Sequence, residues 1–556
     1  MFTTELIKNK EFNILYVKEV NNYLLVDMMY DDKSSTQKRT GDELLDIALR
    51  QSEKEYERLK KIIASWEKIN ENKDSQPSLY TLCLHPVRKC NYECEYCFAE
   101  RSEYLPSNEI TIETAKKAID FMINDWGKEA KRYVVDIAGS GEPLLRFDFI
   151  RELEEYCELK RKEKSKDIKI MFPSNGSLIS EENIEYFENN HNILVGVSID
   201  GNEEQNSNRK CKSIGSAFDK TAKGIDLLKN RGVGLAATIT HVNENVNEVY
   251  DFLYKRFNNA DAISLNVVRD FDRKSKTSFY DIDIDNLLKH YEMLLEKVYD
   301  NVLNENYNYI RKLMIGTDTL GIYLNRVFSK GVLHKKRCGI VKCLLSVDEN
   351  GVLYTCSVSN GNRYFKVGDI YEGINKERQE FFKNINVENN NYCKECWAAN
   401  ICSGECLMTS YLTHGNLEEV NKDMCKFRKG LISLIIQFAC KLQLNNPIGY
   451  NHVLGIVKNR TFFEQVIDSG IWAVQEYIKY KEINVKYSEV LSKIESTDYG
   501  TEPRAIMNAL SVFCDGIDAY KISNIDEVTK ISFPAIAYVN KSKTSYYQYI
   551  LIYGLE

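Results

Sequence analysis

The stretch "LYTLCLHPVRKCNYECEYCFAE", residues 79–100, joins an apolar, strand-like run to three closely spaced cysteines. Three residues separate Cys90 from Cys94, and two separate Cys94 from Cys97. A four-thiolate metal site needs a fourth ligand, but the next cysteine, Cys157, stands alone in a charged run. If this trio binds a metal, we expect one coordination position to remain open.

An alternating pattern continues from residue 79 onward. Short apolar, β-branched runs such as "RYVVDIAG", "IKIMFPS", "ILVGVSID", "GLAATITHV" and "AISLNVV" are separated by segments of helical spacing, for example "TIETAKKAIDFMIND". This alternation, about six units long, predicts an α/β fold in which a parallel sheet with crossover helices forms an open or partial barrel. The trio follows the first strand, at the end where parallel barrels carry their chemistry.

Length and charge narrow the class of protein. The 556 residues suggest about three or four domains, and a net charge of −7 with dispersed Lys and Arg argues against nucleic acid as a partner. No N-terminal stretch resembles a signal peptide, and the apolar run "GLISLIIQFACKLQL" is too short and too polar to span a bilayer. We therefore expect a soluble cytoplasmic protein that does not bind membranes.

Eleven of the sixteen cysteines fall into two clusters. In a reducing compartment such clusters indicate metal or redox chemistry rather than disulfides. The second cluster holds eight thiols, enough for two fully ligated iron–sulfur clusters or for two structural zinc sites: Cys338, Cys343, Cys356, Cys393, Cys396, Cys402, Cys406 and Cys425. The other five are expected to be core or inert thiols: Cys83, Cys157, Cys211, Cys440 and Cys514.

The Cys-x3-Cys-x-aromatic-Cys pattern, with Tyr96 as the aromatic residue, resembles the radical S-adenosylmethionine (SAM) superfamily. The later cysteines resemble a SPASM domain, and the two resemblances together cover about residues 79 to 430. They imply three 4Fe-4S clusters, SAM, and an electron donor such as flavodoxin or ferredoxin. SAM would chelate the open iron of the trio's cluster and, after taking one electron, yield a 5′-deoxyadenosyl radical. The implied auxiliary sets are Cys338, Cys343, Cys356 and Cys406, and Cys393, Cys396, Cys402 and Cys425.

The resemblance also implies contacts to SAM. "AGSGEP" is similar to the family's Gly-Gly-Glu-Pro motif, and "PSNGSLI" and "VSIDG" resemble its segments after the third and fourth strands. The family usually has glycine at the position of Ser140. The serine alters the shape of the loop only if a positive φ is required there. The guanidinium of Arg209 matches the SAM carboxylate. The candidate cofactor contacts are Tyr96, Phe98, Ser140, Gly141, Glu142, Ser174, Asn175, Ser198 and Arg209.

The predicted domain order is a strand-and-helix cap or peptide-docking region at residues 1–77, the partial barrel at 78–310, a bridging segment at 311–337, the SPASM domain at 338–430, and an α+β domain at 445–556. This last region resembles the cysteine peptidase domain that trims double-glycine leaders. Ser469 and Gln548 occupy its Cys and His positions, so catalysis is not expected. The region is then either a leader-binding module or an ordinary packing domain.

These resemblances together imply a radical SAM oxidoreductase that installs a thioether or carbon–carbon crosslink in a ribosomally made precursor peptide with a leader. One alternative is a sulfatase maturase that forms formylglycine. Such enzymes typically place an Asp base after a SPASM cysteine, whereas Ser357 follows Cys356 here. The other alternative is a non-enzymatic, metal-stabilised peptide-binding protein.

Overall fold

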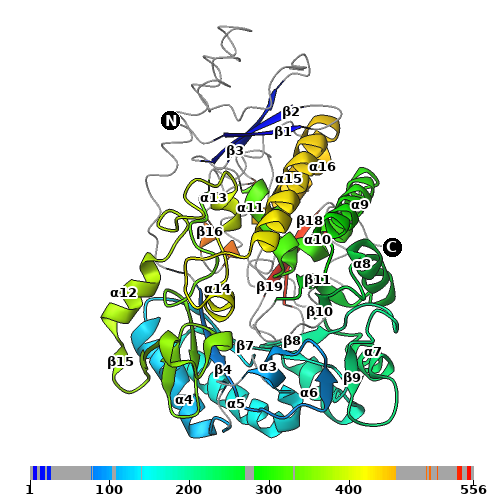
Figure 1. Ribbon diagram of the computed structural model, residues 1–556. Coiled ribbons are helices and arrows are strands. Elements are labelled where there is room, and N and C mark those ends of the chain that lie inside the picture. The colour runs from blue at the N-terminus through cyan, green and yellow to red at the C-terminus, as the bar shows by residue number, and fades with distance from the viewer. Residues whose placement is uncertain are drawn as a thin grey trace. The chain divides into compact units, whose positions relative to one another are not determined.

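The computed structural model describes most of the chain between residues 79 and 458 (Figure 1). The described ranges are 4–8, 13–18, 22–26, 77, 79–102, 105, 108–138, 141–269, 281–329, 332–458, 477, 496–497, 500–501, 510, 535–540 and 547–552. The chain divides into two compact units, residues 1–454 and 455–556. The helix predicted near residues 42 to 72 and the cysteine Cys514 lie outside the described ranges.

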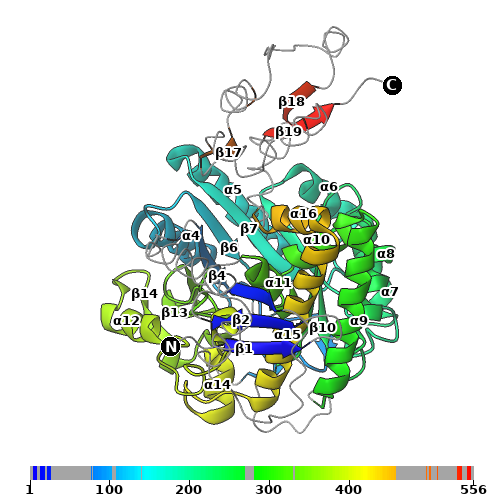
Figure 2. The same cartoon turned by 90° about the horizontal axis from the view of Figure 1, so that it is seen from above.

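All six strands predicted from the alternating pattern are present and lie side by side in one sheet. Each pairs in parallel with its neighbour, in the order β11-β10-β8-β7-β6-β4, and Figure 2 shows β4, β6 and β7 adjacent. The strands are β4 (Leu79–Leu84), β6 (Arg132–Asp136), β7 (Asp167–Ser174), β8 (Ile193–Ser198), β10 (Val233–Ile239) and β11 (Ala260–Val267). The expected parallel α/β architecture is thus confirmed.

Helices connect these strands and begin at polar residues. The side chains of Thr111, Ser216 and Asn245 each accept a hydrogen bond from a backbone N–H in the first turn of the following helix, which fixes where the helix starts. Figure 1 shows α4 to α7 together on one side of the sheet. The connecting elements are α3 (Phe98–Arg101), α4 (Ile112–Phe121), η2 (Met122–Trp126), η3 (Pro143–Arg146), α5 (Phe147–Lys164), α6 (Glu181–Asn189), α7 (Ala217–Leu227) and α8 (Val246–Arg256).

The cysteine-rich region continues the barrel sheet, a feature that the sequence did not predict. Strand β12 pairs in parallel with β4, and three further strands extend the sheet in antiparallel fashion to ten strands. The added elements are β12 (Leu344–Val347), β13 (Val352–Tyr354), η5 (Ser357–Ser359), η6 (Arg363–Phe365), β14 (Lys366–Asp369) and β15 (Gly373–Ile374). This pairing places the second cysteine cluster against the first strand of the barrel.

Helices form most of the rest of the first unit. The segment expected to bridge the barrel and the cysteine-rich region is largely helical, because α10 and α11 fill it and contact β11. The long helix α15 packs against α9 and α11. These helices are α9 (Ile284–Leu303), α10 (Tyr307–Ile315), α11 (Thr319–Phe328), α12 (Lys376–Asn384), α13 (Ala399–Cys402), α14 (Leu407–His414), α15 (Lys422–Asn445) and α16 (Pro447–Lys458).

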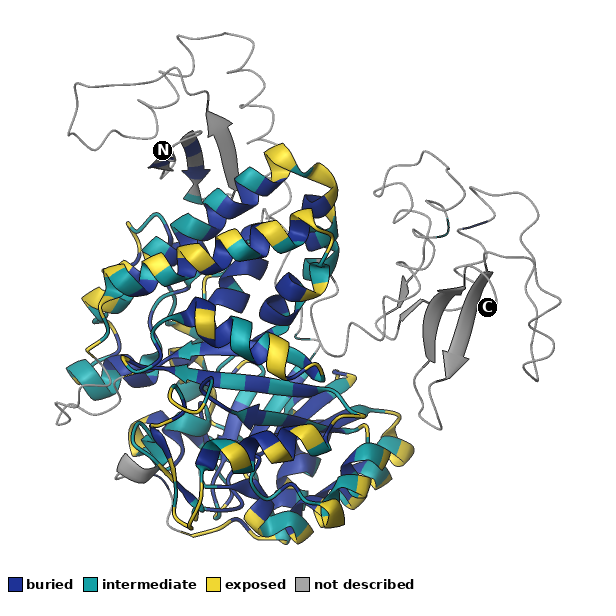
Figure 3. Ribbon diagram, turned by 90° about the vertical axis from the view of Figure 1, so that its right-hand side faces the viewer, coloured by how far each residue is buried: buried dark blue, intermediate teal, exposed yellow. Residues whose placement is uncertain are grey.

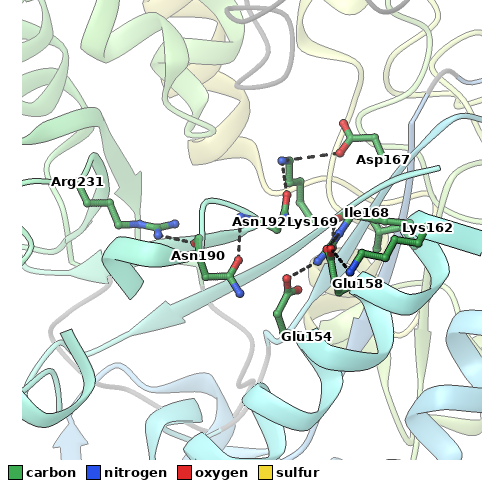
Figure 4. A network of polar contacts seen from close by, with 10 residues as sticks. Glu154, Glu158, Lys162, Asp167, Ile168, Lys169, Asn190, Asn192 and Arg231 are labelled. Atoms are coloured by element: carbon green, nitrogen blue, oxygen red, sulfur yellow. Dashed lines mark hydrogen bonds and ion pairs between the residues drawn. The ribbon is translucent and has the colours of Figure 1, made fainter. Parts of the chain in front are cut away.

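A polar network lies at the amino-terminal ends of β7 and β8 (Figure 4). The Lys169 ammonium donates to Asn192 Oδ1 at 2.7 Å and lies 3.8 Å from the Asp167 carboxylate. On α5, Arg161 donates to the backbone oxygen of Ile168 at 2.6 Å. Burial lowers the pKa of Lys169 to about 8, with Asp167 opposing. The protein's own charged groups therefore occupy the amino-terminal ends of these two strands.

A small antiparallel sheet near the N-terminus contains β1 (Thr4–Lys8), β2 (Asn13–Val17) and β3 (Asn22–Val26). It contacts the cysteine-rich region. The rings of Tyr16 and Trp397 meet edge to face at 5.6 Å, and the Asn400 amide donates to the backbone oxygen of Lys18 at 2.9 Å. Trp397 directly follows Cys396, so this sheet packs beside the predicted second auxiliary set.

Within the second unit, β18 (Ala535–Asn540) and β19 (Tyr547–Ile552) form an antiparallel pair, as do the short strands β16 (Ser496–Thr497) and β17 (Gly500–Thr501). Gln548 of β19 pairs in register with Val539 of β18. Ser469 lies outside the described residues. Across the described parts of both units, no helix has the length and apolar character needed to cross a membrane.

Candidate active site

The inner face of the parallel sheet is only half-buried. Along β8 and β10 every second residue is buried, and the intervening residues are partly exposed, so the strands alternate between dark blue and teal (Figure 3). Small residues occupy this face at Gly196, Gly234 and Ala236, which are neighbours in register. A Cβ atom added to Gly234 would meet no atom within 4 Å. The inner face therefore has space that a ligand could use.

The cysteine trio lies in the loop between β4 and α3, as predicted. Cys94 ends β5 (Tyr92–Cys94), which pairs with β9 (Arg209–Cys211) so that Cys94 is opposite Arg209. Burial raises the pKa of Cys94 to about 12, with Arg209 opposing and the thiols of Cys97 and Cys90 adding to the rise. The three sulfurs thus act on one another from a single loop, which fits a cluster held by three cysteines.

Behind the trio, Tyr96 joins two charged groups. Its hydroxyl donates to Asp200 Oδ2 at 2.5 Å and accepts from Arg209 Nη1 at 2.9 Å. The other oxygen of Asp200 accepts from the backbone N–H of Thr238 at 2.8 Å, which ties the trio's loop to β10. Arg209 Nε is shielded from solvent and has no partner among the described residues, so this guanidinium retains one donor for an acidic ligand.

Glu142 connects the loops that follow β6 and β7. Its carboxylate accepts from Ser174 Oγ at 2.8 Å and from the backbone N–H of Asn175 at 2.7 Å. Its own N–H donates to the backbone oxygen of Lys89 in the trio's loop at 2.9 Å. The Asn175 amide lies 3.8 Å from Cys90 Sγ. Three predicted cofactor contacts, Glu142, Ser174 and Asn175, are therefore brought together with the trio, although the side chains of Glu142 and Ser174 bond to each other.

Gly141 adopts a left-handed conformation, with φ of +68°, and a Cβ atom there would lie 2.6 Å from the Lys89 oxygen. Glycine is thus required at this position by both backbone angle and space. Ser140, where the sequence departs from the family pattern, lies outside the described residues. Ser198 ends β8 on the half-buried inner face, and Phe98 begins α3 directly after Cys97.

Sequence reasoning missed two residues of this region. Asp200 stands in the quoted "VSIDG" motif, but only Ser198 was taken from it. Asp136 ends β6 and is paired in register with Cys83 of β4 and with Met171 of β7. The strand pattern could have placed both acids at the carboxyl ends of parallel strands, where a barrel binds ligands.

Seven of the eight later thiols interact within two groups. Cys338 is an exposed residue, but its thiol is surrounded by protein atoms, which raises its pKa, and the thiols of Cys406 and Cys356 add to the rise. Burial raises the pKa of Cys393 to about 12, to which three other thiols contribute: Cys402, Cys425 and Cys396. The members of each group come from one predicted set, and the sets themselves stay a prediction. Cys343, the fourth predicted member of the first set, lies in the turn before β12, where its N–H donates to the Gly339 oxygen at 2.8 Å.

Cationic side chains lie near thiols of both cysteine groups. Although burial raises it, the pKa of Cys406 is below its ordinary value because Arg269 and Arg337 favour the thiolate. Arg428 forms a buried pair with Glu405, with contacts of 3.0 and 2.6 Å. Thiolate-ligated clusters carry net negative charge, and a buried charge needs compensation. Arg269 and Arg337 supply such compensation near Cys406, so the residues present fit an iron–sulfur cluster there.

A cavity of about 50 Å³ lies between the two cysteine groups. Its lining includes Cys338 and Cys406 of the first group and Cys393 of the second, together with Arg337 and Glu405. No group of three or more His, Cys, Asp or Glu side chains in the described part of the chain is gathered closely enough to hold a single metal ion.

Comparison with known proteins gives this geometry a context. Residues 84–253 match the sequence model of the radical SAM superfamily. The radical SAM cyclopropyl synthase TigE of Paramaledivibacter caminithermalis is 26% identical over 370 residues, which cover 63% of this chain and 72% of TigE. The serine-type anaerobic sulfatase-maturating enzyme of Bacteroides thetaiotaomicron is 28% identical over 374 residues, covering 63% of this chain and 87% of that enzyme.

A similar fold occurs in a solved structure of anSMEcpe with bound AdoMet, at 20% sequence identity and a TM-score of 0.55. The superposition covers 68% of this chain and 99% of that one. A further structure of anSMEcpe contains both AdoMet and a Kp18Cys peptide, with a TM-score of 0.53. The first unit therefore has the mixed α/β fold of these SAM-binding proteins.

Proposed function

We propose that this chain, a radical SAM enzyme with a sulfatase-maturating enzyme among its relatives, installs a thioether or carbon–carbon crosslink in a ribosomally made precursor peptide. In this proposal Cys90, Cys94 and Cys97 hold a cluster that SAM completes, and the two cysteine groups hold two auxiliary clusters. When bound, the first cluster and SAM supply a 5′-deoxyadenosyl radical, which removes a hydrogen atom from unactivated carbon.

The observation that carries the proposal is the half-buried inner face of β8 and β10, to which the trio's loop is tied through Tyr96 and Asp200. Glycine and alanine along these strands allow a peptide backbone to approach the sheet closely. A charged network occupies the amino-terminal ends of β7 and β8. In this proposal the peptide enters at the carboxyl ends and lies against the inner face, where a reactive radical is protected from water.

The chain's own residues position SAM in this scheme. Gly141 and Glu142 shape the loop that follows β6, and Glu142 fixes it to the trio's loop through the Lys89 oxygen. Arg209 offers its free Nε donor to the SAM carboxylate. Tyr96 holds that guanidinium in place through a 2.9 Å hydrogen bond.

Leader recognition is assigned to the second unit. Its resemblance to a peptidase domain, with Ser469 and Gln548 at the catalytic positions, supports a groove that binds the leader without cutting it. The N-terminal sheet is the competing candidate, because it packs against the cysteine-rich region through Tyr16 and Trp397.

A second function, formylglycine formation in a sulfatase, is favoured by the match to the Bacteroides thetaiotaomicron enzyme. The absence of an acid directly after Cys356 counts against it, since Ser357 occupies that position. Both functions start with hydrogen abstraction, and their products separate them.

The test uses the reconstituted full chain, SAM, a reductant and a synthetic peptide encoded by a short reading frame beside the gene. Tandem mass spectrometry should find the peptide lighter by two hydrogens, with fragments missing between two linked residues. An aldehyde that reacts with a hydrazide, formed instead in a sulfatase-type serine peptide, would establish the second function. Deoxyadenosine without change in either peptide would contradict both.

A further inference from the structure

The strongest unassigned feature on the inner face is the carboxylate of Asp136. This residue ends β6, so its side chain lies at the carboxyl edge of the sheet. In register it pairs with Cys83 on one side and with Met171 on the other. Met171 is 37% exposed, although it lies within a central strand. Asp136 therefore lies beside the open part of the inner face.

Among the described residues, only one oxygen of this carboxylate has a hydrogen-bond partner. The Cys83 thiol lies 3.8 Å from Asp136 Oδ2 and donates to it. Oδ1 is shielded from solvent and has no hydrogen-bond partner among the described residues. A buried carboxylate oxygen without a partner is costly, because its desolvation is not compensated. Asp136 as a whole is partly exposed and pairs with the exposed Met171, so a ligand on this face could supply the missing donor.

Cys83 also connects Asp136 to the first cysteine group. Its thiol is hydrogen-bonded by the backbone of Ser357, and it is close enough to Cys356 for the two thiols to affect each other's ionisation. Through Cys83 on the neighbouring strand, Asp136 is thus linked to the turn that contains Ser357. The sulfatase-maturing family typically has an Asp at the position of Ser357. On the other side, the loop after β6 touches the trio's loop at Lys89. Asp136 is thus linked to the first cysteine group through Cys83, and the loop that follows its strand is linked to the trio's loop through Glu142.

We infer that Asp136 is a catalytic residue that contacts the substrate peptide and accepts the proton released when the substrate radical is oxidised. This inference rests on the proposed function. In thioether formation a C–H and an S–H bond break and a C–S bond forms. One hydrogen leaves as an atom to the 5′-deoxyadenosyl radical, the other leaves as a proton to Asp136, and one electron passes to an iron–sulfur centre as acceptor. Formylglycine formation from serine has the same balance, with an O–H bond broken and a C=O bond formed.

The ionisation of Asp136 is compatible with this role. Burial raises the pKa of its carboxyl to about 7, and the hydrogen bond from Cys83 opposes the rise. A group with a pKa near neutrality can both accept a proton from the substrate and return it to solvent within a turnover.

The experiment compares wild type, Asp136→Asn and Asp136→Glu as reconstituted full chains. The probe is the synthetic peptide from the neighbouring reading frame, deuterated at its α-carbons. Asp136→Asn should bind SAM and peptide nearly as wild type does and should still transfer deuterium into 5′-deoxyadenosine, yet form at least tenfold less crosslinked product. Asp136→Glu should recover part of the product. Asp167→Asn, which alters a carboxylate at the opposite end of the neighbouring strand, serves as the matched control and should retain normal product formation.

Three results would overturn the inference. The first is product formation by Asp136→Asn at the wild-type level, and the second is a loss of peptide binding in this variant that parallels its loss of product. The third is an affinity of Asp136→Asn for SAM that is at least tenfold lower than that of wild type, which would place the carboxylate against SAM. Failure of the proposed function is recognised separately, because wild type itself would then leave the precursor peptide unlinked. If wild type instead oxidises a sulfatase-type serine peptide, the same variants are scored on the aldehyde product, with the same expectation. Deoxyadenosine without change in either peptide would contradict both functions and, with them, the inference.

Discussion

His85 lies buried directly after β4, and its Nε2 is 3.3 Å from Ser346 Oγ in the neighbouring strand β12. Burial lowers the pKa of this imidazole to about 4, and the nearby Arg88 lowers it further. The ring is therefore neutral in the folded protein at physiological pH. Between this value and the unfolded pKa of about 6.5, the unfolded chain binds a proton that the folded chain does not.

This difference predicts an acid-dependent loss of stability. The contribution of neutral His85 to the free energy of unfolding is fully present above the pKa of the unfolded chain and is lost as the pH falls toward the pKa of the folded chain. Between about pH 7.5 and pH 5.5 the loss amounts to about 1 kcal/mol. Urea unfolding of the reconstituted protein, followed by circular dichroism, should show this loss in wild type and a smaller one in His85→Gln. Equal losses in the two proteins would show that His85 does not titrate as its burial implies.

At the residue scale, spacing in the sequence predicted that Cys90, Cys94 and Cys97 lie together, since nearby positions in one loop stay together in any fold. Their role as cluster ligands follows from the family resemblance and stays a prediction. The contacts of Tyr96 could not be found from spacing, because Asp200 and Arg209 are brought to it only by the pairing of β5 with β9 and of β8 with β10. The strand pattern offered the positions of Asp136 and Asp200 at strand ends, but not their contacts.

At the scale of elements, helix α15 carries both a predicted cluster ligand and one side of a buried ion pair. Cys425 lies in its first turn, and Arg428 follows almost one turn later. Arg428 forms two hydrogen bonds with Glu405, and the two side chains are 2% and 3% exposed. Glu405 directly precedes Cys406, so the pair connects the two cysteine groups through one helix. The integrity of both groups should therefore depend on this contact.

Arg428→Met is expected to destabilise the protein by about 3 to 5 kcal/mol, because it leaves Glu405 buried without a counter-charge. The double variant with Glu405→Gln should recover most of this loss. Denaturant unfolding and iron content per chain would measure both effects. Lys426→Met is the matched control on the same helix, because its pair with Asp285 is exposed and should contribute less than about 1 kcal/mol. A loss of similar size in the control and in Arg428→Met would contradict the assigned role.

The strands of the barrel were predictable because each apolar run is bounded by polar segments and followed by a helix of regular spacing. The extension of the sheet by β12 to β15 was not, because these strands have only two to four residues each. So short a run carries no periodicity, and its pairing with β4 depends on contacts between residues more than 250 positions apart. The assignment of the later cysteines to two ligand sets rests on the family's order of ligands and stays a prediction.

At the scale of the whole molecule, the chain divides into two compact units between residues 454 and 455. The first unit contains the trio, both cysteine groups and the inner face. The proposal assigns hydrogen abstraction to residues of this unit and leader binding to the second unit.

A chain ending at Lys458, which retains α16, tests this division. We expect it to cleave SAM in the absence of peptide nearly as fast as the full chain, because the trio and its supporting loops are intact. Its affinity for the full precursor should fall at least tenfold, about 1.4 kcal/mol, while its affinity for a leaderless core peptide should stay the same, since leader contacts alone are removed. Calorimetry on both chains with both peptides gives the four values needed. Should the shortened chain bind full precursor as tightly as the intact one, recognition must lie elsewhere, and the N-terminal sheet beside Trp397 becomes the region to vary next.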